Sequence, residues 1–121
     1  MTHRADRVQR HLQELRTSHP ARYQLARYIS LAARVDQPFL RKVRLQLVRQ
    51  ARAQDETELW FGPLVETFNA QGFVLLPEAA SRLRDTLRGE TEAINAVYRI
   101  LNKCHPHLAP EFQLDEQLIA E

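Results

Sequence analysis

The chain has 121 residues and a formal charge of +2 at pH 7, from 17 Lys and Arg against 15 Asp and Glu. This length suits one domain with its own core, and the single cysteine excludes an internal disulfide and suits a reducing, cytoplasmic compartment. Three glycines leave no room for a Gly-rich nucleotide loop, and no stretch resembles a signal peptide or the ~20 apolar residues of a membrane span.

Helical periodicity begins near the N-terminus. Val8, Leu12 and Leu15 form one narrow stripe and predict a peripheral helix over about 4–16. Pro20 then suits the first turn of a second, central helix over about 20–35. Asp36 is the expected N-cap of a third helix, with Pro38 in its first turn and apolar positions continuing to Ala51.

The middle of the chain is harder to assign. Asp55 as N-cap and Glu58 three residues later resemble the capping box of a fourth helix. Pro63 must interrupt any helix there, so we expect a short helix over about 63–69 that ends at Gly72. Residues 73–76 are extended, as either a lone short strand or a buried linker.

Three more helical segments follow. Pro77 opens a helix that stops at Gly89, and Thr91 caps one that stops before Pro106. An amphipathic segment over about 112–119 closes the chain, which suggests the N-terminal module of a longer protein. We therefore expect a single all-α domain over 1–121, a compact bundle of six or seven helices with at most one short extended segment near 73–76.

The predicted core follows from the inward positions of these helices. It comprises Leu12, Leu25, Tyr28, Ile29, Ala32, Val43, Leu47, Trp60, Leu64, Leu83, Leu87, Ile94, Val97 and Leu101.

Few residues carry the marks of catalytic or metal chemistry. Cys104, His105 and His107 lie close together, but a structural zinc site needs four ligands and no second cysteine exists. Cys104 and His105 are neighbours at a helix end and point apart, which disfavours a nucleophilic pair. We therefore predict no catalytic, cofactor or metal site and no enzymatic activity, although a site completed by another domain stays open.

The charge is divided between the two halves of the chain. Residues 1–53 carry 12 Lys or Arg against 3 Asp or Glu, whereas residues 54–121 carry 5 against 12. The halves could pair within one molecule or between molecules, and the sequence does not separate these alternatives. The basic face of the second and third helices (Arg22, Arg27, Arg34, Arg41, Lys42, Arg44, Arg49 and Arg52) could instead bind nucleic acid, although no aromatic residue interleaves it.

Trp60 and Phe61 stand beside the Gly62-Pro63 break. The simplest interpretation is a buried aromatic anchor between helices. The alternative is a partly exposed interaction hot spot, because Trp is enriched at such sites.

Three stretches resemble a known kind of domain. Residues 19–35 (HPARYQLARYISLAARV), 58–65 (ELWFGPLV) and 72–77 (GFVLLP) are similar to the small helical effector-associated domains of bacterial conflict-system proteins. The resemblance covers about residues 7–119. In such proteins the domain precedes an effector or sensor module, for example a formylglycine-generating-enzyme-like, C-type-lectin-related domain. It implies an adaptor role and no active site.

We therefore predict a non-enzymatic protein-interaction module, with nucleic-acid binding as the alternative. The expected partner is a domain of the same type, including a second copy, or another conflict-system component. The predicted interface residues are Arg41, Arg44, Arg49, Arg52, Glu56, Glu58, Trp60 and Glu66.

Overall fold

The computed structural model describes residues 2–104, and the predicted last helix and loop, including His105 and His107, lie outside this range. The described part is mostly helical, in the order α1 (Thr2–Ser18), α2 (Pro20–Ile29), α3 (Gln37–Leu47), α4 (Ala53–Trp60), β1 (Val65–Asn69), β2 (Gly72–Leu75), α5 (Pro77–Asp85) and α6 (Thr91–Cys104). The helical expectation is thus confirmed, but the pure all-α prediction is wrong because a hairpin stands in the middle of the chain. Every helix in residues 2–104 is too short or too polar to cross a bilayer.

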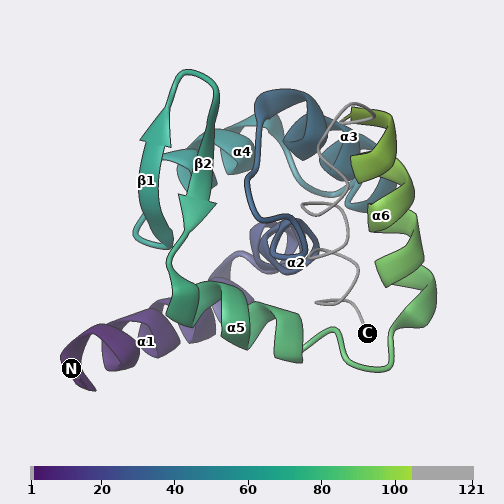
Figure 1. Ribbon diagram of the computed structural model, residues 1–121. Coiled ribbons are helices and arrows are strands. Elements are labelled where there is room, and N and C mark those ends of the chain that lie inside the picture. The colour runs from purple at the N-terminus through teal and green to yellow at the C-terminus, as the bar shows by residue number, and fades with distance from the viewer. Residues whose placement is uncertain (1, 105–121) are drawn as a thin grey trace.

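α2 occupies the centre of the molecule (Figure 1). It contacts each of the other five helices, as its broad apolar face predicts. α1 and α5 lie together along one side, and α3 packs against α6 on another. The hairpin stands beside α4, away from α6 (Figure 1).

The hairpin replaces the helix predicted over 63–69. β1 and β2 pair antiparallel, with Phe68 opposite Phe73 and Asn69 opposite Gly72. The turn between them is built by Asn69, whose Oδ1 accepts hydrogen bonds from the backbone N–H groups of Gln71 at 2.8 Å and Gly72 at 3.2 Å. Such a side-chain bond offers the backbone an alternative to the helix. Gly72 therefore opens a strand and does not cap a helix.

The second helix is shorter than predicted because Val35 joins the hairpin. Val35 donates a backbone hydrogen bond to Phe73 O at 2.9 Å and accepts one from Phe73 N at 2.8 Å. These two bonds require extended backbone at Val35, so α2 ends at Ile29 and a turn leads to the bridge. The strand β2 thus lies between β1 and the segment at Val35.

The N-cap predicted for α3 is confirmed, whereas the one predicted for α4 is not. Asp36 is the N-cap of α3, and its Oδ1 accepts from Phe39 N at 3.0 Å. The predicted cap at Asp55 is wrong, because Arg52 is the N-cap of α4 and Asp55 lies one turn inside. There the Asp55 carboxylate accepts from Arg52 N at 2.8 Å and also binds Arg22 at 2.9 Å. The helix predicted to stop at Gly89 ends already at Asp85, and Gly89, with φ of +85°, lies in the turn that follows.

The core extends through all the helices and under the hairpin. Ten of the predicted core residues are buried, whereas Tyr28, Leu47, Trp60 and Ile94 are partly buried and pack against its edge. The largest buried side chains include Phe39 and Phe73, both absent from the predicted core. Phe73 enters the core because the hairpin, which was not predicted, turns its ring inward.

Candidate functional site

Ion pairs join the two oppositely charged halves of the chain. Of the seven ion pairs among the described residues, six connect an arginine before residue 53 with an acid after it. They are Arg4–Glu66, Arg4–Glu78, Arg22–Asp55, Arg27–Glu90, Arg41–Glu56 and Arg44–Glu56. Over residues 2–104, these particular charges are therefore paired within the molecule.

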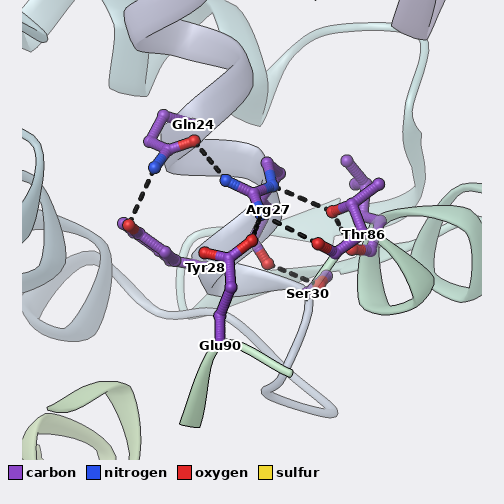
Figure 2. A network of polar contacts seen from close by, with 7 residues as sticks. Gln24, Arg27, Tyr28, Ser30, Thr86 and Glu90 are labelled. Atoms are coloured by element: carbon purple, nitrogen blue, oxygen red, sulfur yellow. Dashed lines mark hydrogen bonds and ion pairs between the residues drawn. The ribbon is translucent and has the colours of Figure 1, made fainter. Parts of the chain in front are cut away.

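The most extensive of these contacts surrounds Arg27 on α2 (Figure 2). Its guanidinium donates to Gln24 Oε1 at 2.6 Å, to Thr86 Oγ1 and Thr86 O at 2.9 Å, and pairs with Glu90. Gln24 lies on α2 itself, whereas Thr86 and Glu90 lie in the connection between α5 and α6. These contacts therefore hold α2 against that connection. Arg27 thus serves the fold and is a poor candidate for contact with a phosphate backbone.

A second charge cluster lies between α3 and α4. The side chain of Glu56 is 7% exposed and pairs with Arg44, which is 15% exposed. Arg41, one helical turn before Arg44, approaches the other oxygen of Glu56 at 3.7 Å and is 49% exposed. One buried carboxylate therefore stands between two guanidinium groups, one covered and one open to solvent.

Four aromatic side chains join α4 to the hairpin. Trp60 meets Phe73 edge-to-face, with ring centroids 5.2 Å apart, and Phe61 meets Phe68 in the same geometry at 5.2 Å. The first pair lies at the edge of the core. The second is exposed, with Phe61 at 65% and Phe68 at 55%. Trp60 thus packs at the edge of the core, as the anchor interpretation requires, whereas the ring of Phe61 is exposed.

The charge cluster around Glu56 and the aromatic side chains meet in one groove of about 460 Å³. This groove lies between the start of α3, the length of α4 and the hairpin tip. Its lining comprises Gln37, Arg41, Ala53, Glu56, Thr57, Trp60, Phe61, Phe68, Asn69 and Ala70. Pockets of this size with an apolar floor and few polar groups are the usual form of binding sites. This groove is the candidate functional site.

The structure brings some predicted interface residues together and separates others. Arg41, Glu56 and Trp60 line the groove, and Arg44 lies behind Glu56. Arg49 and Arg52 are exposed outside the lining.

Glu58 faces a separate cavity of about 60 Å³ beside His11, and Glu66 pairs with Arg4 on α1. Sequence reasoning missed Phe68. The signal available for it was an aromatic residue directly before an Asn-x-x-Gly turn.

The pKa values of His11 and Cys104 depart from their ordinary values. Burial lowers the pKa of His11, with Glu14 opposing and Arg22 adding to this effect. Burial likewise raises the pKa of the Cys104 thiol, which disfavours the reactive thiolate. Within the described part of the chain, His, Cys, Asp and Glu form no group of three or more that could hold a metal ion.

No protein-family model, curated protein or solved structure matches this chain.

Proposed function

We propose that this chain is a non-enzymatic protein-interaction module, an adaptor that binds a partner protein through the groove between α4 and the hairpin. The observation that carries the proposal is the exposed Phe61–Phe68 pair at the mouth of an apolar groove. Exposed apolar surface rimmed by polar groups is characteristic of protein interaction sites. Aromatic and arginine side chains, both present here, dominate the energetics of such interfaces.

Two features of the sequence support the proposed role and location of the module. The resemblance to effector-associated domains agrees with an adaptor that couples an effector or sensor domain to its partner in a bacterial defence or signalling system. A cytoplasmic location is part of the proposal, supported by the lone cysteine, which suits a reducing compartment.

The nucleic-acid alternative receives less support from the geometry. It relied on the arginines of the second and third helices. Arg22, Arg27 and Arg44 instead form ion pairs with Asp55, Glu90 and Glu56. Binding a phosphate would require breaking those pairs. The affinity of such binding comes mainly from cationic groups that are free to contact phosphates. Because these arginines are paired, this surface has fewer free cationic groups than the charge count suggests.

The test compares the full chain with two matched surface variants. The double variant Phe61→Ser/Phe68→Ser removes the exposed ring pair, and Leu45→Ser removes an apolar side chain that is 54% exposed on α3, outside the groove. Each protein is mixed with purified products of neighbouring genes, and binding is followed by co-elution and by the fluorescence of Trp60. Trp60 is the only tryptophan of the chain and lines the groove.

We expect a partner to bind the wild type and Leu45→Ser equally and to lose binding to the double variant. Circular dichroism confirms that each variant is folded. Equal binding to all three proteins would show that the groove is not the interface.

A further inference from the structure

The charge cluster at the groove is unbalanced. Glu56 presents one carboxylate to two guanidinium groups, which leaves a net charge of one positive unit in the cluster. Arg44 takes the nearer oxygen and is mostly covered. Arg41 reaches the other oxygen only at 3.7 Å, longer than a hydrogen bond, with half of its side chain exposed. Arg41 therefore has unused donors on the groove side.

The rest of the groove rim adds no negative charge. Among the described residues, Glu56 is the only acid in the lining, and its side chain is 7% exposed. The remaining polar lining residues, Gln37, Thr57 and Asn69, are neutral. The charge that a partner meets in this groove is therefore that of Arg41.

The apolar part of the groove lies on different elements from Arg41. Arg41 is on α3, whereas Phe61 follows α4 and Phe68 is on β1 (Figure 1). All three line the same groove, so a segment lying in it meets a cation on one wall and an aromatic pair on the other. Charge complementarity with Arg41 then determines which polar group a bound segment carries.

We propose that the groove binds a segment of a partner protein in which an apolar side chain is adjacent to a carboxylate. The apolar side chain covers Phe61 and Phe68, and the carboxylate completes the Arg41–Glu56–Arg44 cluster as its second anion. This inference rests on the proposed function, because it names the chemistry of the partner for that same groove. A carboxylate fits a guanidinium in a bidentate geometry, which sets the position as well as the charge of the ligand.

The experiment selects ligands from random twelve-residue peptides displayed on phage, against the full chain. Parallel selections use Arg41→Glu and the matched control Arg49→Glu, an exposed arginine outside the groove. We expect wild type and Arg49→Glu to enrich Leu, Phe or Trp next to Asp or Glu. Arg41→Glu should exchange the acidic preference for Lys or Arg.

The best enriched peptide is then synthesised in two forms, with its acid intact and with Gln in its place. Titrations followed by Trp60 fluorescence use wild type and Arg41→Gln. We expect Arg41→Gln to weaken the acidic peptide by about tenfold and to leave the Gln peptide unchanged, because a charged hydrogen bond is lost only in the first case. Thermal unfolding verifies that both Arg41 variants are folded.

The outcomes separate this inference from the proposed function. Peptides that require Phe61 and Phe68 but show no acidic preference overturn the inference and leave the interaction module standing. No enrichment over the Phe61→Ser/Phe68→Ser variant overturns both. A dimer in light scattering that the same double variant abolishes makes a second copy the occupant. Single-stranded DNA binding that requires Phe61, Phe68 and Arg41 makes the ligand a nucleic acid, and either result overturns the inference.

Discussion

Gly72→Ala is expected to destabilise the protein by a backbone clash. A Cβ at this position would lie 2.6 Å from Val35 O, a main-chain atom that cannot rotate away. That carbonyl would have to retreat by about 0.8 Å to reach ordinary van der Waals contact at 3.4 Å. The same carbonyl accepts the bond from Phe73 N at 2.8 Å, and Val35 N donates to Phe73 O at 2.9 Å, so the movement strains both bonds of the bridge.

The magnitude follows from these bonds. Each contributes about 1 kcal/mol net, and looser packing of the buried Phe73 ring adds about as much again. Replacing Gly by Ala restricts the unfolded chain and opposes this loss by about 0.5–1 kcal/mol. We expect the free energy of unfolding to fall by about 2 kcal/mol.

The assay is urea denaturation at 25 °C followed by the emission of Trp60, whose ring contacts Phe73. Gly89→Ala is the matched control, since Gly89 has φ of +85° and open space where a Cβ would lie. It should cost about 1 kcal/mol through backbone strain alone and leave the native Trp60 emission unchanged. Because Ala is the better residue where no clash exists, unchanged or increased stability of Gly72→Ala would refute the close approach to Val35.

Three further predictions concern buried or partly buried groups. Glu56→Gln removes the anion from between its two arginines and leaves Arg44, which is 15% exposed, without its acid. Urea denaturation should therefore show that the free energy of unfolding falls by about 3 kcal/mol. The control Glu58→Gln, at an exposed position, should lower it by less than about 0.5 kcal/mol. Phe73→Ala should cost about 3–4 kcal/mol in the same assay, because it empties a site that is 1% exposed, and a loss below about 1 kcal/mol would mean that the hairpin is not part of the core. Burial lowers the pKa of His11, so the unfolded chain binds a proton at this residue more readily than the folded one. The free energy of unfolding should therefore fall as pH drops below about 6.5. In unfolding measured between about pH 7.5 and 5, His11→Gln should make this dependence of stability on pH less steep.

The helices were predictable because their signals are local. Val8, Leu12 and Leu15 repeat at helical spacing and are buried on one face of α1. Asp36 lies two residues before Pro38 and caps α3 through a hydrogen bond to Phe39, only three residues along the chain. Such signals act between residues that are neighbours along the chain, so they operate before any tertiary contact forms.

The hairpin depended on contacts across the chain. Residues 65–69 contain helix formers and strand formers together, and what decides between them is the pairing of β2 with both β1 and Val35. Val35 and Phe73 are far apart in sequence, and no local pattern connects them. The error at α2 has the same origin, since its end is set by that bridge.

The candidate site divides in the same way. Composition and order along the chain determined that this would be a mostly helical protein with a basic half, an acidic half and an aromatic pair at Trp60-Phe61. Only the tertiary structure decided that most of the pairs join the halves within the molecule, that Phe61 meets Phe68, and that Arg41 keeps an exposed charge beside them. The physical reason is that ion pairs and ring contacts act only between groups a few ångströms apart in space, and the packing of the elements sets those distances.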